Sequence, residues 1–109
     1  MRIAVIGSRT VREIDFDRVG AVAGDVIVSG GARGPDSLAA EEARRRGLEV
    51  VEYLPDYRRF GRAAPHVRNR EIVENCDRLV AFWDGASRGT AETVRLARRN
   101  GRNVQIVGC

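Results

Sequence analysis

The sequence has no lysine, and only one histidine and two cysteines. All 19 basic side chains are therefore arginine. The absence of lysine excludes a Walker-type phosphate lysine, a Schiff-base lysine and pyridoxal-dependent catalysis. His66, Cys76 and Cys109 are too few and too far apart in the sequence for a multi-histidine or structural zinc site. We expect no metal or other cofactor, and any active site must consist of arginine, carboxylates, hydroxyls and backbone.

Aromatic residues and long apolar runs are also scarce. Aromatic residues make up 6% of the chain, and no segment approaches the roughly 20 apolar residues of a membrane span. The apolar run that opens the chain is too short for a signal peptide, and two cysteines make no disulfide framework. With 109 residues, 43% of them hydrophobic, we expect one cytoplasmic domain over residues 1–109 and no membrane partner.

The net charge of +4 is concentrated in one stretch of the sequence. Residues 55–70 contain five arginines and one acidic residue, Asp56, whereas the remainder holds 14 arginines and 14 acidic residues. A GC-rich coding sequence also replaces lysine by arginine, so the arginine count alone is no functional signal. The position of the excess is informative, because arginine holds phosphate bidentately and stays charged at physiological pH.

Short apolar runs alternate with helical patterns along the chain, which is typical of βα units. Runs rich in Val and Ile suit strands of a parallel sheet buried on both faces, and five are predicted: Ile3–Ile6, Val26–Val28, Leu48–Leu54, Leu79–Trp83 and Asn103–Val107. The segments between them predict four helices, at Asp15–Ala23, Pro35–Arg46, Val67–Cys76 and Thr90–Asn100. The order βαβαβαβαβ predicts an α/β fold, a Rossmann-like three-layer sandwich with a five-stranded parallel sheet.

Loops that combine small residues with an arginine follow three of the predicted strands: Gly7-Ser8-Arg9-Thr10, Ser29-Gly30-Gly31-Ala32-Arg33-Gly34-Pro35-Asp36 and Asp84-Gly85-Ala86-Ser87-Arg88-Gly89-Thr90. Glycine permits close approach, the first amides of the following helices supply donors, and arginine adds a charged fork. Ligands of such sheets bind at the carboxyl ends of the strands. The loops therefore predict a cradle for a phosphate-bearing ligand. The first loop lacks the G-x-G-x-x-G spacing, which disfavours a nicotinamide or flavin dehydrogenase.

Four segments carry a family resemblance: Gly7–Arg9, Ser29–Ala39, Gly61–Asn69 and Ala81–Thr90. Together they resemble the YspA, or cpYpsA-related, branch of the SLOG superfamily, nearly end to end and in the same motif order. Relatives in that superfamily include the Smf/DprA proteins, the LOG phosphoribohydrolases and molybdenum-cofactor carriers. The resemblance implies a Rossmann-like domain that binds nucleotides or nucleotide-derived ligands across these loops.

The resemblance also raises an enzyme alternative, an N-glycosidic hydrolase of nucleoside monophosphates. LOG-type hydrolases use an arginine near the start of the third helix and a glutamate three positions after the Gly-Thr of the fourth loop. Arg68 matches that arginine, but Thr93 stands where the glutamate is expected. Glu92 lies one position away, about 100° round the helix, and Asp36 and Asp84 are other carboxylates that would serve. The threonine disfavours hydrolysis, and Arg68 with Glu92 is the catalytic pair if the protein is an enzyme.

Single-stranded nucleic acid binding, as in the Smf/DprA proteins, is the second alternative. Such binding joins a basic groove to aromatic stacking platforms, and Tyr57 and Phe60 both lie in the basic stretch. The neighbouring Arg58, Arg59 and Arg62 are predicted to occupy a long irregular loop.

We expect binding of a nucleotide or nucleotide-derived phosphate ligand, of the nucleoside monophosphate or ADP-ribose/NAD-derivative type, by a sensor or sequestering protein. The expected ligand contacts are Gly7, Ser8, Arg9, Ser29, Gly30, Gly31, Ala32, Arg33, Gly34, Asp36, Arg68, Asn69, Asp84, Gly85, Ser87, Gly89 and Thr90. A homodimer or higher homo-oligomer is also expected, because so short a chain has little to cover a five-stranded sheet.

Overall fold

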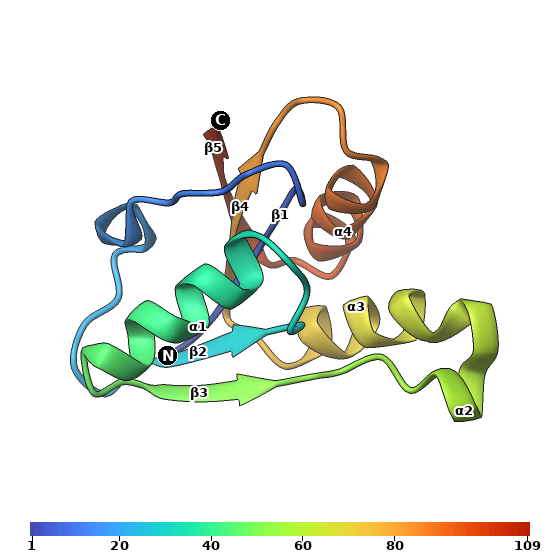
Figure 1. Ribbon diagram of the computed structural model, residues 1–109, viewed down its shortest axis with the longest axis horizontal. Helices are drawn as coiled ribbons and strands as arrows, with labels where there is room; N and C mark the ends of the chain where they lie inside the picture. Colours follow the sequence, from blue (N-terminus) through green and yellow to red (C-terminus); the bar gives the residue numbers. More distant parts are fainter.

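The computed structural model describes residues 1–109 and contains one five-stranded parallel sheet (Figure 1). Its strands are β1 (Arg2–Gly7), β2 (Val26–Ser29), β3 (Glu49–Glu52), β4 (Arg78–Trp83) and β5 (Asn103–Gly108). All five predicted strands are present, and only β3 is clearly shorter than its predicted range. The α/β, Rossmann-like three-layer fold is therefore confirmed.

The strand order is β3-β2-β1-β4-β5. From β1 the chain moves outward to β2 and β3, then returns to the centre and moves the other way through β4 and β5. The order therefore reverses between β1 and β4, which lie side by side with Gly7 opposite Phe82 at their carboxyl ends. A crevice opens at such a reversal, because the connections on either side leave in opposite directions.

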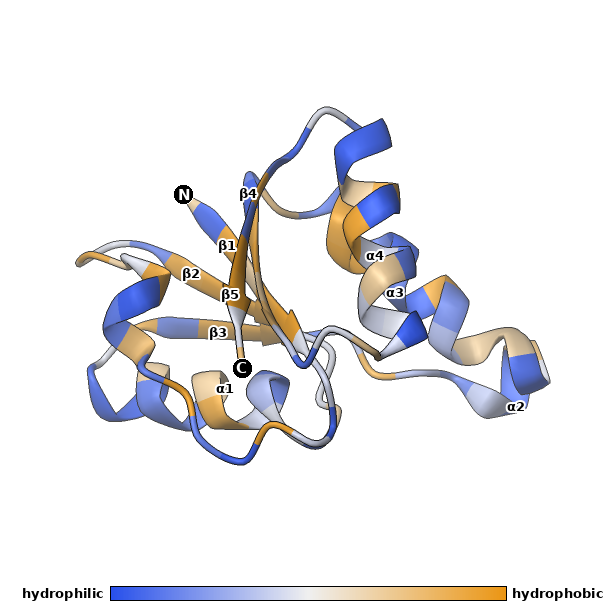
Figure 2. Ribbon diagram, turned by 90° about the horizontal axis from the view of Figure 1, so that it is seen from above, coloured by the Kyte–Doolittle hydropathy of each residue, from blue (hydrophilic) through white to orange (hydrophobic).

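The helices are α1 (Pro35–Arg45), α2 (Tyr57–Phe60), α3 (Ala64–Glu74) and α4 (Arg88–Arg99), with two 3₁₀ turns, η1 (Phe16–Val19) and η2 (Gly61–Ala63). Figure 2 shows α1 on one side of the sheet and α3 and α4 on the other. Adjacent residues of β1 point to opposite faces of the sheet. Ile3 and Val5 enter the core beneath α1, whereas Ala4 and Ile6 enter the core beneath α3 and α4. The alternating apolar residues of β1 thus supply both cores.

The predicted helix over Asp15–Ala23 is wrong. Only the single turn η1 forms there, between the Asp15 cap and Gly20, whose φ of 70° ends the turn. Phe16 and Val19 are both buried, as predicted, but Ala23 is exposed. A spacing of three residues suits a 3₁₀ turn as well as an α-helix, so the apolar stripe alone did not distinguish the two.

The irregular loop predicted around Arg58, Arg59 and Arg62 is also wrong. These residues lie in α2 and η2, two short turns that Figure 1 shows projecting from the body of the protein between β3 and α3. Asp56 caps α2 by accepting a hydrogen bond from the backbone of Arg59 at 3.1 Å. The third main helix also begins earlier than predicted, at Ala64, because Pro65 fits its first turn. No helix in the structure is both long enough and apolar enough to span a bilayer.

Candidate functional site

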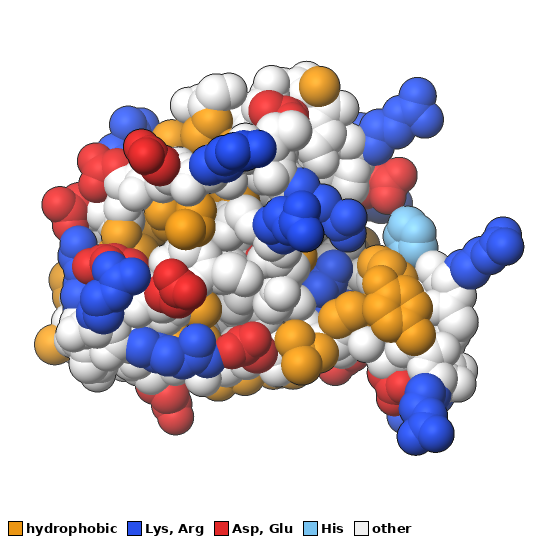
Figure 3. All heavy atoms as spheres, in the orientation of Figure 1, with side chains coloured by type: hydrophobic (Ala, Val, Ile, Leu, Met, Phe, Trp, Pro, Cys, Tyr) orange, Lys and Arg blue, Asp and Glu red, His pale blue; other side chains and the backbone are white.

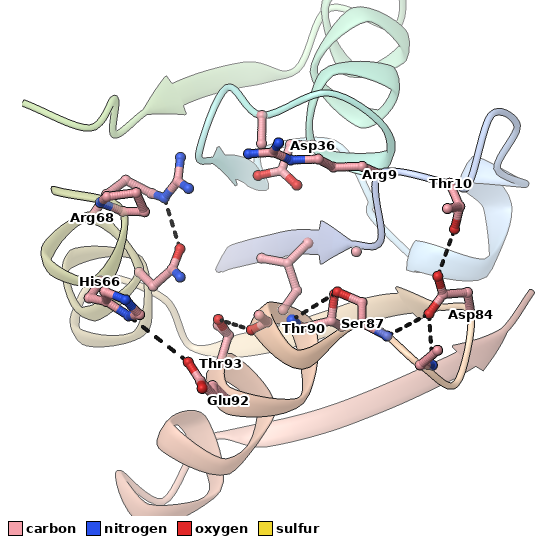
Figure 4. A pocket seen from close by; sticks show the side chains of 17 residues that line it. Arg9, Thr10, Asp36, His66, Arg68, Asp84, Ser87, Thr90, Glu92 and Thr93 are labelled. Carbon is pink, nitrogen blue, oxygen red and sulfur yellow. Dashed lines mark hydrogen bonds and ion pairs between the residues drawn. The ribbon is translucent and has the colours of Figure 1, made fainter. Parts of the chain in front are cut away.

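A cavity of about 530 Å³ lies where the strand order reverses, beyond the carboxyl ends of β1 and β4 (Figure 4). Its walls come from β1 and the loop after it, from the start of α1, from the first half of α3, and from the loop between β4 and α4. The lining residues are Ile6, Gly7, Arg9, Thr10, Ala32, Asp36, Pro65, His66, Arg68, Asn69, Asp84, Ala86, Ser87, Gly89, Thr90, Glu92 and Thr93. Polar and charged side chains dominate, and no Phe, Tyr or Trp is among them.

Asp84 organises the loop between β4 and α4. Its Oδ1 accepts the backbone N–H groups of Ala86 and Ser87 at 2.9 and 2.8 Å, and its Oδ2 accepts the Thr10 hydroxyl at 2.7 Å. The Thr10 hydrogen bond, followed by the two backbone donors, holds the pKa of Asp84 well below its usual range. The Asp84 carboxylate therefore links the loops after β1 and β4, and both of its oxygens already accept hydrogen bonds from the protein.

The first turn of α4 forms one wall of the cavity. Ser87 is its N-cap, with its Oγ 3.4 Å from the Thr90 backbone nitrogen and 3.1 Å from the Thr90 hydroxyl. Thr93 donates its hydroxyl to the Gly89 carbonyl at 2.9 Å. A Cβ added at Gly89 would meet nothing within 4 Å, so this glycine is not required by packing. It keeps the wall open beside the helix N-terminus, where backbone amides favour an anion.

Asp36 and Arg68 flank the cavity on its opposite side and are held by one peptide group. The Gly30 amide donates to Asp36 Oδ2 at 3.0 Å, and Arg68 Nη1 donates to the Gly30 carbonyl at 2.6 Å. Arg68 Nε also donates to Asn69 Oδ1 at 2.8 Å. These hydrogen bonds use Asp36 Oδ2 and Arg68 Nε and Nη1, and both side chains line the cavity. The pair therefore offers a ligand one acceptor and one charged donor.

Burial sets the protonation of Asp36. Its side chain is 5% exposed, and desolvation raises its pKa to about 6, against the opposing effects of the Gly30 hydrogen bond and the Arg68 charge. A carboxyl group with a pKa near neutrality exchanges its proton readily at physiological pH, which is common at functional sites. Asp36 and Asp84 thus lie in one cavity with pKa values displaced in opposite directions.

His66 and Glu92 form an exposed part of the lining. His66 Nδ1 lies 3.9 Å from Glu92 Oε2, and the side chains are 71% and 52% exposed (Figure 4). The cavity also contains Thr93, at the position where LOG-type hydrolases carry glutamate. Glu92 and Thr93 line the same cavity, although adjacent residues point in different directions around the helix axis.

The structure brings ten of the seventeen expected contact residues into this cavity: Gly7, Arg9, Ala32, Asp36, Arg68, Asn69, Asp84, Ser87, Gly89 and Thr90. The other seven, Ser8, Ser29, Gly30, Gly31, Arg33, Gly34 and Gly85, do not line it. Ser8 is 1% exposed, and its hydroxyl accepts the Asp84 amide at 3.1 Å. Ser29 is fully buried and donates to the Asp36 carbonyl at 3.1 Å. Both serines shape the loops from within.

Sequence reasoning did not single out several lining residues as contacts. Thr10 and Thr93 lie inside or beside the motifs, but their contribution depends on hydrogen bonds to Asp84 and Gly89 that no motif specifies. Ile6, Pro65 and Ala86 contribute small parts of the wall because of their place beside the motif residues. No residue type or spacing distinguishes them from residues with a purely structural role.

Comparisons with known proteins give two related sequences. The gene 61 protein of Mycobacterium phage D29 is 38% identical over 84 residues, which cover 72% of this chain and 67% of the phage protein. An uncharacterized protein of Archaeoglobus fulgidus is 30% identical over 95% of this chain and 78% of the archaeal protein. No family model matches the chain, and no solved structure matches it with comparable significance.

Proposed function

Because this chain belongs to one family with the mycobacteriophage gene 61 protein and the Archaeoglobus protein, neither of which has a name that states an activity, we propose its function from the cavity itself. The proposal is that the protein binds a nucleotide or nucleotide-derived phosphate ligand there. Membership of the SLOG superfamily, and a role as a sensor or sequestering protein, are parts of the same proposal. The motif order and the confirmed fold support both.

The observation that carries this proposal is the place of the cavity in the fold. Open parallel sheets bind ligands outside the carboxyl ends of their strands where the strand order reverses. In this sheet the reversal lies between β1 and β4, and the loops that follow these strands both contribute residues to the cavity wall. The cavity therefore lies where the general rule predicts a ligand site in such a sheet.

The chemistry of the walls suits the parts of a nucleotide. The open wall at Gly89, beside the N-terminus of α4, suits a phosphate, and Arg9 and Arg68 supply cationic forks. The carboxylate of Asp36, which lines the cavity, suits a ribose hydroxyl, since a carboxylate accepts such a donor strongly. A lining with three carboxylates and few apolar side chains is less suited to a hydrophobic ligand.

A steric block of the cavity tests the proposal. Gly89→Leu places a side chain into the cavity, where an added Cβ meets no protein atom, so the fold tolerates it while the ligand loses space. The matched control is Gly108→Leu, at a glycine with equally open surroundings that does not line the cavity. Binding of nucleoside monophosphates, ADP-ribose and NAD is measured by calorimetry.

We expect wild type and Gly108→Leu to bind at least one of these ligands, and Gly89→Leu to bind it at least roughly tenfold more weakly, a difference of about 1.4 kcal/mol. Absence of binding by the wild-type protein, or equal binding by all three, contradicts the proposal. Native mass spectrometry of protein purified without added nucleotide provides an independent check for a retained ligand.

N-glycosidic hydrolysis is the second candidate, because Arg68 and Glu92 line the same cavity. In that reaction water replaces the base at the ribose carbon, releasing the free base and ribose 5-phosphate. Incubation with nucleoside monophosphates followed by chromatography separates the two candidates. Base release that Glu92→Gln abolishes would establish hydrolysis, whereas binding without turnover leaves the protein a binder.

A further inference from the structure

A second cavity, of about 560 Å³, adjoins the first across the loop that follows β1. Its walls are Arg9, Thr10, Val11, Arg12, Arg33, Gly34 and Leu38. Arg9 and Thr10 line both cavities, so the two spaces share a wall. Arg33, one of the expected contacts that the first cavity lacks, lines the second.

Gly34 brings the two arginine-bearing loops together. A Cβ added at Gly34 would lie 2.9 Å from the Ser8 carbonyl oxygen and 3.4 Å from the Arg9 Cα, and the φ of 96° is itself one that glycine favours. The loop before α1 therefore packs directly on the loop after β1. This contact places Arg33 on the same cavity as Arg9 and Arg12, although 21 residues separate Arg12 from Arg33 in the sequence.

The two cavities differ in charge. The first contains the carboxylates of Asp36, Asp84 and Glu92 beside only two arginines. The second has three arginines and no acidic residue in its lining. None of these three arginines forms an ion pair with a carboxylate of the chain. Figure 3 shows arginine side chains gathered on this face, where the loop after β1 meets the loop before α1.

One cluster of neighbouring arginines elsewhere in the chain is neutralised by carboxylates. At the end of α1, Arg44 pairs with Glu52, Arg45 with Glu42, and Arg46 with both Asp17 and Glu42. Arg9, Arg12 and Arg33 lack such partners, and a multiply charged anion is the ligand that would bring them together, since guanidinium groups bind phosphate bidentately.

We propose that the second cavity is a second phosphate subsite, and that the ligand is a nucleoside diphosphate or a nucleotide with a pyrophosphate bridge. This inference rests on the proposed function of the first cavity. The nucleoside and its first phosphate lie in the first cavity, near Asp36 and Gly89. The second phosphate passes Arg9, the wall shared by both cavities, and is held by Arg12 and Arg33.

Matched mono- and diphosphates test the subsite. Calorimetry compares AMP with ADP, GMP with GDP, CMP with CDP and UMP with UDP, so that each pair differs only in the second phosphate. The variants are Arg12→Gln and Arg33→Gln, both at exposed side chains. The control is Arg58→Gln, which removes the same charge from an exposed residue of α2 that lines neither cavity.

We expect the diphosphate of at least one pair to bind roughly tenfold more tightly than its monophosphate, as one charge-assisted contact provides. Arg33→Gln removes most of that advantage and changes monophosphate binding less than about twofold, and Arg58→Gln leaves both affinities unchanged. Equal affinity within every pair, or an Arg33→Gln variant that weakens both members alike, overturns the subsite but leaves the first cavity as a nucleotide site. Absence of binding for all eight nucleotides refutes both proposals.

Discussion

The buried carboxyl group of Asp36 contributes less to the stability of the folded state at neutral pH than in mild acid. Its pKa is about 6 in the folded state, whereas the ordinary value is 3.8. Between these values the folded protein binds the proton more tightly than the unfolded chain. The stabilisation from this group is therefore fully present below about pH 4 and is lost as the pH rises through about 6.

The Asp36→Asn substitution removes this penalty. The pKa difference corresponds to about 3 kcal/mol of stability lost by neutral pH. Asparagine retains an oxygen that accepts the Gly30 amide, and Arg68 keeps its hydrogen bonds to the Gly30 carbonyl and to Asn69. We expect the variant to exceed wild type by up to about 3 kcal/mol near pH 8 and to match it near pH 4.

Urea denaturation followed by circular dichroism at about pH 4, 6 and 8 measures the free energy of unfolding of both proteins. Glu13→Gln, at an exposed carboxylate without an ion pair, is the control and should change stability by less than about 0.5 kcal/mol. An Asp36→Asn variant that is less stable than wild type at pH 8, or equally offset at all three pH values, would refute the reasoning. Weaker nucleotide binding by the same variant would show that the costly carboxyl group serves the ligand.

Three other changes test the loops around the cavity, each by thermal and urea denaturation. Gly7→Ala places a Cβ against the Phe82 carbonyl oxygen and should cost about 1–3 kcal/mol or more, whereas Gly24→Ala, with open space but a φ of 91°, should cost about 1 kcal/mol. Ser87→Ala removes the α4 cap and should cost about 1 kcal/mol. Asp84→Asn should lower stability at neutral pH, and the loss should shrink as the pH falls, because the pKa of Asp84 is depressed in the folded state.

The sheet could be predicted because its sequence pattern has a direct physical cause. The continuous apolar run at Ile3–Ile6 has no polar face, so the strand must be covered on both sides. The structure places its alternate residues in two separate cores. Glycine also follows the ends of two helices, because Gly47 and Gly101 both adopt positive φ just after α1 and α4. In these segments burial and local backbone preference favour the same structure, and the sequence indicates the first by apolar runs and the second by glycine.

The segments that were predicted wrongly lack that agreement. Gly20 limits η1 to one turn, although the apolar spacing of Phe16 and Val19 continued to favour a helix. Asp56 caps α2, but Tyr57 is 59% exposed and α2 has no buried residue. The sequence therefore contains no apolar face that would predict a helix there. Short turns of this kind depend on a few hydrogen bonds rather than on burial, and periodicity does not detect them.

The candidate site shows the same limit in three dimensions. Motifs directed attention to the loops after β1, β2 and β4, and all three contribute residues to the first cavity, because the carboxyl ends of parallel strands share an edge. They did not distinguish residues that face the cavity from those that shape its walls. Ser8 and Thr10 are two positions apart, yet one is buried beneath Asp84 and the other faces the cavity. That distinction depends on the side-chain hydrogen bonds of the folded loop.

Charge gives the strongest example, because the basic stretch at residues 55–70 supplies few arginines to the two cavities described above. Of its five arginines, only Arg68 lines either of them. Arg9, Arg12 and Arg33 belong to the part of the sequence that is neutral overall. They form no ion pair, whereas several acidic residues of that part pair with the arginines at the end of α1. Folding separates charges that cancel in the sequence. A neutral segment can therefore supply the phosphate-binding surface, and the arginine substitutions proposed for the second cavity test whether it does.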